Sequence, residues 1–80
     1  MSTLELLEQA LQEALPFGGK VVVCAENNSV EIMSGDKFVA RGVHREPEKA
    51  IEACARAFLI SAPHGPCVQA LRERVLRGSA

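Results

Sequence analysis

The feature that most constrains this chain is a set of three short apolar segments separated by two tight turns. The first segment, 21–25, is rich in β-branched residues, which favour strands. Two asparagines follow at 27–28, and asparagine tolerates the positive φ angle that a two-residue hairpin loop requires. Segments 30–33 and 38–43 flank a second turn at 34–37. Two consecutive hairpins predict a three-stranded antiparallel meander.

A two-residue loop at 27–28 would also fix the register of the first hairpin. One face of the hairpin is then apolar, and the other is half apolar, although a solvated face usually alternates with polar residues. The predicted pairs are Ala25 with Val30 and Val23 with Ile32 on one face, and Cys24 with Glu31 and Val22 with Met33 on the other. We therefore expect either helices on both faces of the sheet or another chain on the second face.

The third strand is less constrained than the first two. Phe38, Ala40 and Gly42 alternate with Val39 and its odd-numbered neighbours, so we expect these three residues to share one side of the strand. The register with the second strand stays open, because a difference of one residue in the loop turns every side chain to the opposite face.

Helical patterns flank the three strands. A capping box formed by Ser2 and Glu5 starts the first helix, which should end near Leu15. A second helix is expected over 47–62, where its small residues would let it lie close to the sheet. A third is expected over about 66–77. The order α-β-β-β-α-α in a single domain of 80 residues predicts an α+β fold, a meander packed by helices.

Charge is distributed unevenly along the chain. Residues 1–40 carry two basic and six acidic groups, a net of −4, and residues 41–80 carry seven and four, a net of +3. The first helix has an acidic face, and the third helix has a basic group. The acidic face consists of Glu5, Glu8, Gln12 and Glu13, and the basic group consists of Arg72, Arg74 and Arg77. Charged helix faces are usually only solvated, but such a bipolar chain could also offer its acidic face to a basic partner.

The chain offers little for metal or covalent chemistry. Among four candidate zinc ligands, only His64 and Cys67 have the close spacing of a structural site, and the other two, Cys24 and His44, lie on separate strands. Cys54 falls on the predicted buried stripe of the second helix. Cys67 is the better candidate nucleophile, but no third catalytic group is visible beside it. We expect no catalytic site, no bound metal and no cofactor.

Nucleic-acid binding is the alternative that the order of elements suggests. The order α-β-β-β-α resembles the double-stranded-RNA-binding domain, whose second helix opens with lysines that contact phosphates. Here the matching segment, 45–49, contains Glu46 and Glu48, which would repel phosphates. No aromatic residue is assigned to base stacking, because all three are interpreted as packing residues: Phe17, Phe38 and Phe58. Direct binding to nucleic acid would depend on Arg72, Arg74 and Arg77.

Residues 30–60 also follow a pattern found in small phage proteins. A short strand at 30–32 and a tight turn at 34–36 precede Phe38-Val39-Ala40, and Pro47 stands shortly before an alanine-rich helix at 50–59. This stretch resembles the phage ABA sandwich family, which tends to carry tryptophan where Phe38 stands. The resemblance implies helices on both faces of the sheet and no catalytic motif.

These observations together predict a small non-enzymatic module that binds a protein partner in the cytoplasm. The phage resemblance implies a host protein or nucleoprotein complex as that partner, with the acidic face inhibiting a CRISPR-type defence complex by occupying a basic groove. A homodimer formed through the open sheet face or an edge strand is a further option. No segment is long and apolar enough to span a membrane, and no signal-peptide pattern is present.

Overall fold

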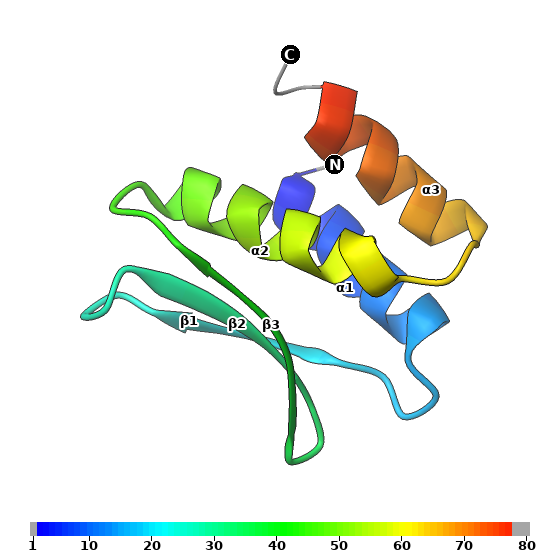
Figure 1. Ribbon diagram of the computed structural model, residues 1–80, viewed down its shortest axis with the longest axis horizontal. Helices are drawn as coiled ribbons and strands as arrows, with labels where there is room; N and C mark the ends of the chain where they lie inside the picture. The colour runs from blue at the N-terminus through cyan, green and yellow to red at the C-terminus, as the bar shows by residue number, and fades with distance from the viewer. Residues whose placement is uncertain (1, 78–80) are drawn as a thin grey trace.

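The computed structural model describes residues 2–77 and shows a three-stranded antiparallel sheet with its helices on one face (Figure 1). The predicted order α-β-β-β-α-α is confirmed, and a short π-helical segment, η1, follows the last helix. The elements are α1 Thr3–Ala14, β1 Lys20–Cys24, β2 Ser29–Ser34, β3 Lys37–Val43, α2 Pro47–Ser61, α3 Pro66–Arg72 and η1 Glu73–Arg77. None of the helices in residues 2–77 has the length and apolar character needed to cross a lipid bilayer.

The capping box at the start of α1 is confirmed. The backbone N–H of Glu5 donates to Ser2 Oγ, and the N–H of Ser2 donates to Glu5 Oε1, both at 3.2 Å. Leu7 and Leu11 are fully buried on one side of the helix, as the leucine spacing predicts. Leu15 caps the C-terminus by donating its N–H to the carbonyl of Leu11, so the helix ends where expected.

The first hairpin has a longer loop than predicted. β1 pairs with β2 so that Val22 lies opposite Glu31 and Val23 lies opposite Val30, a shift of two residues from the expected register. Of the residues at 25–28 only Asn28 has a positive φ, of 53°, whereas a two-residue hairpin loop of type I′ needs two such residues. The shift is an even number, so the two faces keep their predicted β2 residues.

A β-bulge in β3 determines which faces of the sheet Phe38 and Val39 occupy. Ala40 pairs with Ile32 and Phe38 pairs with Met33, which leaves Val39 as the extra residue. Ala40 and Gly42 share the face toward the helices, but Phe38 lies on the opposite face, so the expectation that all three share one side is wrong for Phe38. Val39 is partly buried and packs against the core.

Helix α2 lies close to β3, as its small residues predict. Ala50 and Cys54 are buried where the helix crosses the strand, and Phe58 fills the next part of the core. A Cβ atom added to Gly42 would collide with the backbone of Ala50 and Cys54. Glycine at this position therefore sets how closely the helix approaches the sheet.

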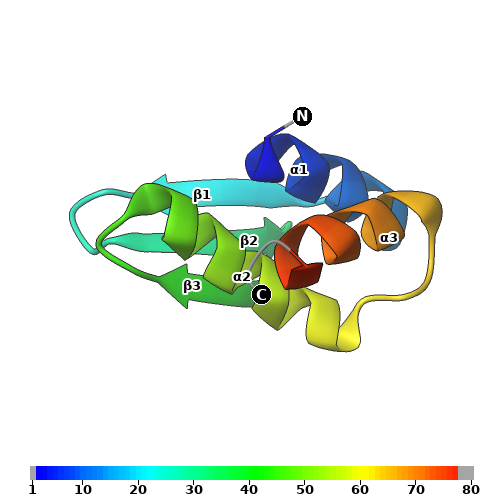
Figure 2. The same cartoon turned by 90° about the horizontal axis from the view of Figure 1, so that it is seen from above.

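The third helix builds a second layer of helix on helix. α3 packs chiefly on α1, and η1 lies against α2 (Figures 1 and 2). The predicted helix over 66–77 is confirmed as a helical region, although its last turn is π-helical. Glycine is favoured just after a helix end, so the sequence also predicts Gly78 as the C-terminal cap of this helix, but Gly78 lies outside the described residues. The resulting core draws on every described helical segment, on the central strand β2 and on the edge strand β3. Its members are Leu7, Ala10, Leu11, Val30, Ile32, Ala40, Ala50, Ile51, Cys54, Ala55, Phe58, Leu59, Val68, Leu71 and Val75.

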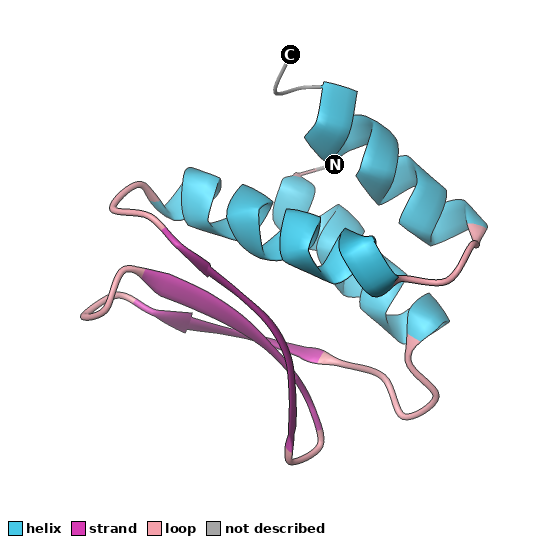
Figure 3. Ribbon diagram, in the orientation of Figure 1, coloured by secondary structure: helices cyan, strands magenta, loops and turns pink. Residues whose placement is uncertain are grey.

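The expectation of helices on both faces of the sheet is wrong. Figure 3 shows every described helix on the same side of the strands, and no element within residues 2–77 lies over the opposite face. The second alternative from the sequence, another chain on this face, stays a prediction.

Candidate functional site

The uncovered face of the sheet is the first candidate surface. Residues of all three strands alternate onto this face, away from the helices, and the pairing of the strands brings them side by side. Three of its apolar side chains are exposed to an unusual degree: Phe38 by 59 %, Val43 by 57 % and Val22 by 38 %. We define the uncovered face by its exposed and half-exposed members: Lys20, Val22, Glu31, Met33, Phe38, Arg41 and Val43.

An ion pair lies in the middle of this face. Arg41 Nε is 3.6 Å from Glu31 Oε1, and these residues are directly opposite each other on β3 and β2. The pair is partly exposed, so it contributes little to stability by itself. Its position among valine, methionine and phenylalanine side chains gives the face both apolar area and a fixed pair of charges, the combination typical of protein-binding surfaces.

A groove adjoins the uncovered face at the end of the sheet. It has a volume of about 630 Å³ and lies between the α1–β1 connection and the start of β3, where Phe17 and Phe38 both line it. Phe17 is 95 % exposed, and only Phe58 of the three phenylalanines is buried. The interpretation of Phe17 and Phe38 as packing residues is therefore wrong. The position of Phe17 between Pro16 and Gly18 in a connection was the available signal, since connections run over the surface.

The acidic face of α1 is solvent-exposed, as predicted, but most of its side chains already have intramolecular partners. Glu5 belongs to the capping box, and Gln12 Nε2 donates to the carbonyl of Gly19 at 3.3 Å. Glu13 binds the start of α3. Within the described part of the chain, only Glu8 of the four makes no side-chain hydrogen bond or ion pair.

Glu13 joins the first and third helices. Its carboxylate accepts the backbone N–H of Cys67, with distances of 3.1 Å to Oε1 and 3.0 Å to Oε2, and the N–H of Val68 at 3.2 Å. These N–H groups begin α3, where no preceding carbonyl is available to them. The hydrogen bond from Cys67 is the main reason that the pKa of Glu13 is lowered. Glu13 is therefore a structural cap supplied from a distant helix.

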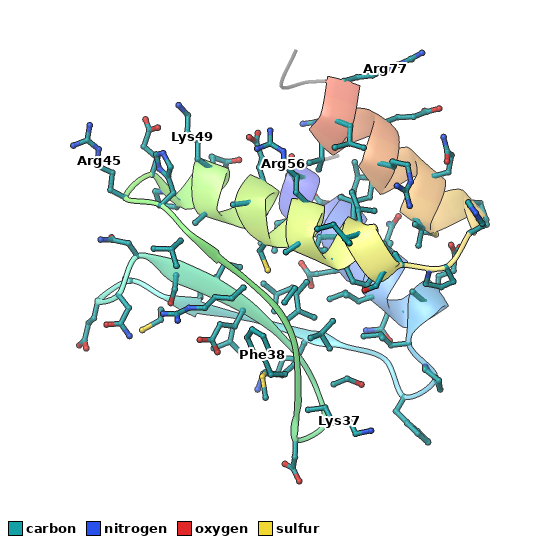
Figure 4. The ribbon with its side chains drawn as sticks, viewed as in Figure 1. Lys37, Phe38, Arg45, Lys49, Arg56 and Arg77 are labelled. Carbon is teal, nitrogen blue, oxygen red and sulfur yellow. The ribbon has the colours of Figure 1, made fainter. Side chains whose placement is uncertain are left out.

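Of the three arginines predicted as a basic group, one makes an intramolecular hydrogen bond and the other two are exposed to solvent. Arg72 Nη2 donates to the carbonyl of Leu59 at 3.4 Å, which ties α3 to α2. Arg74 and Arg77 are exposed on η1, and Figure 4 shows Arg77 and Arg56 on the side of the helices away from the sheet. Nucleic-acid binding through Arg72, Arg74 and Arg77 stays a prediction, which a salt-dependent gel-shift assay with duplex DNA and RNA would test.

The candidate nucleophile Cys67 lies in an environment that does not activate a thiol. A hydrogen bond to the Glu13 carboxylate is the main cause that raises the pKa of Cys67. Burial raises the pKa of Cys54 to about 11. Nucleophilic cysteines need the opposite shift, toward the thiolate at neutral pH.

Cys24 and His44 line the same cavity beside the start of α2, although nothing in the sequence requires them to lie close together. The cavity measures about 120 Å³, which is small compared with the 300–1,000 Å³ of typical ligand pockets. His44 Nδ1 accepts the N–H of Glu46 at 2.9 Å, so this ring nitrogen is already used. Within residues 2–77, no three metal-ligating side chains form a group that could hold an ion.

Comparison with known proteins adds no assignment: no protein-family model, no curated protein and no solved structure matches this chain.

Proposed function

We propose that this protein is a small non-enzymatic module that binds a protein partner through the uncovered face of its sheet. One observation carries the proposal: Val22, Phe38 and Val43 are all exposed on a sheet face that none of the helices in residues 2–77 covers. Large exposed apolar side chains on one sheet face, here arranged around the Glu31–Arg41 ion pair, are typical of interaction sites.

The composition of the surface supports a protein as the ligand. Aromatic and arginine side chains dominate the energetics of protein interfaces, and Phe38 and Arg41 lie on neighbouring parts of the uncovered face. Phe17 adds a second exposed aromatic at the adjoining groove. A partner that inserts an apolar side chain into this groove would contact both phenylalanines.

The matched variants Phe38→Ser and Ile60→Ser test the proposal. Each replaces an exposed apolar residue, but Ile60 lies on α2 and not on the sheet. We expect Phe38→Ser to weaken binding to a partner captured by the wild-type chain by about tenfold or more, and Ile60→Ser to leave it unchanged. The measurement is calorimetric titration of the purified partner, after thermal melts confirm that both variants are folded. Equal effects of the two variants, or no effect of either, would contradict the proposal.

The hypothesis of a phage inhibitor of a host defence complex concerns a different surface. In that version Glu5, Glu8, Gln12 and Glu13 contact a basic groove of the complex. Since Glu5 and Glu13 make internal hydrogen bonds, the informative change is Glu8→Lys, with Glu48→Lys on α2 as the control. We expect Glu8→Lys, but not Glu48→Lys, to abolish inhibition of a nucleic-acid-guided complex in a cleavage assay. Full inhibition by Glu8→Lys would exclude the acidic face as the contact.

A further inference from the structure

The two edges of the sheet differ in how they are protected against pairing with another strand. β3 carries Lys37 and Arg41 and is distorted by the bulge at Val39, all features that discourage pairing at an edge. β1 has the sequence Lys-Val-Val-Val-Cys, pairs regularly with β2, and contains no bulge and no proline. The β1 edge therefore lacks the usual protection except at Lys20.

The second half of β1 is also left uncovered on the helical side of the sheet. Figure 2 shows β1 along one rim of the sheet. Helix α1 lies over the first half of β1 only, and α2 lies over the part of the same face that β2 and β3 form. Val23 points to the helical side with Val30, its partner on β2, yet it remains 56 % exposed. Val22 is exposed on the opposite face. Both faces of the strand thus present apolar surface next to its free edge.

Charges at the two ends of this segment are complementary to a second copy of the same segment. Lys20 begins β1 and Glu26 lies two residues beyond its end, and both are exposed and outside the ion pairs formed by the described residues. In an antiparallel arrangement of two copies, the start of each strand lies beside the end of the other. With Val22 on a two-fold axis, Lys20 of each copy lies opposite Cys24 of the other and diagonal to Glu26, within reach of a long side chain, with valines between the two pairs of charges.

We propose that β1 pairs with β1 of a second copy, in antiparallel orientation, to form a homodimer with a continuous six-stranded sheet. A two-fold axis through the middle of β1 makes the contact self-complementary and closed, so it stops at two copies. The pairing satisfies backbone groups along one edge and places Val23 of one copy beside Val21 of the other. This contact is separate from the uncovered face, which remains available in the dimer.

The size of the contact sets its strength. A five-residue strand pair extends over only about 17 Å. Such a contact buries less than the roughly 1,200–2,000 Å² of a standard stable interface, so we expect a reversible, concentration-dependent dimer.

Charge-swapped variants give a decisive test. Lys20→Glu would place two carboxylates together at each end of the dimer, and Glu26→Lys would place two ammonium groups together. We expect each single variant to raise the dimer dissociation constant, measured by sedimentation equilibrium, by about tenfold. The double variant should regain the wild-type value. An equimolar mixture of the two single variants should also associate, because each Glu at position 20 or 26 then has a Lys of the other copy as its diagonal neighbour.

Several outcomes would overturn the proposal. One is a wild-type chain that stays monomeric at every concentration tested. Another is a pair of single variants that dimerise like the wild type, or that fail to associate when mixed although each is folded by circular dichroism. A dimer that is abolished by Phe38→Ser and unaffected by the charge swaps would show association through the uncovered face, and would equally refute pairing through β1.

Discussion

The three cysteine thiols show how strongly the local environment of a residue changes its chemistry within one small domain. Cys54 is fully buried on the side of α2 that faces the sheet, and burial raises the pKa of its thiol to about 11. Cys67 is partly buried, and its hydrogen bond to Glu13 raises its pKa. Cys24 is partly exposed at the end of β1. Only the thiolate reacts with disulfide reagents, so pKa and exposure together determine the order of labelling.

The expected order of labelling by an aromatic disulfide reagent is therefore Cys24, then Cys67, then Cys54. Under native conditions Cys54 should react only as fast as the domain opens, and all three thiols should react at once in denaturant. Peptide mass spectrometry of samples quenched at different times identifies the modified position. Rapid native labelling of Cys54 would contradict its burial. The variant Cys24→Ser is the control that assigns the fast phase.

Among the elements, the close approach of α2 to β3 depends on Gly42. A Cβ atom there would lie 2.9 Å from Cys54 Cα and would also collide with backbone atoms of Ala50, which cannot move independently of the helix. We expect Gly42→Ala to lower the free energy of unfolding by about 1–3 kcal/mol or more, measured by urea denaturation.

Gly35→Ala is the matched comparison for this overpacking. An added Cβ at Gly35 meets open space, but its φ of 62° is unfavourable for alanine, so we expect a cost of about 1–2 kcal/mol from backbone strain alone. If Gly42→Ala is no more destabilising than Gly35→Ala, the Cβ collision does not determine the packing of α2.

The docking of α3 on α1 should depend on pH through Glu13. Its pKa is lowered from 4.5 in the folded state, mainly by the hydrogen bond from the N–H of Cys67. The ionised carboxylate therefore stabilises the fold at pH values above the unfolded pKa, and this contribution is lost as the pH falls through the folded pKa. We expect Glu13→Gln to lower the melting temperature near neutral pH, and the difference from wild type to close as the pH falls below 4.5 and through the lowered pKa of the folded state.

Glu8→Gln is the control for this pH dependence, since Glu8 lies on the same exposed side of α1 without the contact to α3. Its melting temperature should follow that of the wild type across the same range. A constant difference between Glu13→Gln and wild type at every pH would indicate that the charge of Glu13 plays no part in holding α3.

At the scale of the whole molecule, periodicity and turn residues were sufficient to predict the order of elements, because each element has its own local pattern. The surface was not predictable in the same way. The bulge that exposes Phe38 depends on how β3 pairs with β2, and no local pattern at Phe38-Val39 records it. Likewise, Glu13 fits the solvated side of α1 by spacing alone, and its role as a cap depends on a segment 54 residues away. Tertiary contacts of this kind determine which charged and aromatic side chains remain exposed and available to bind a partner.

The helical layer also predicts how the molecule responds to truncation. α1 packs chiefly on α3, and Leu7 and Leu11 are fully buried. We expect a chain ending at Gly65 to lose its cooperative thermal transition in circular dichroism, because these leucines would be exposed. A sharp transition in the truncated chain would show that the sheet, α1 and α2 are stable without the third helix.

The same packing determines when the domain can fold during its synthesis. The ribosome makes α1 first, but the hydrogen bonds from Cys67 and Val68 to Glu13 join two segments that leave the exit tunnel far apart in time. Until the later segment emerges, the apolar side of α1 lacks its packing partner and stays exposed on the nascent chain, where chaperones can bind it. Folding of this small domain therefore cannot be completed before Cys67 and Val68 have emerged.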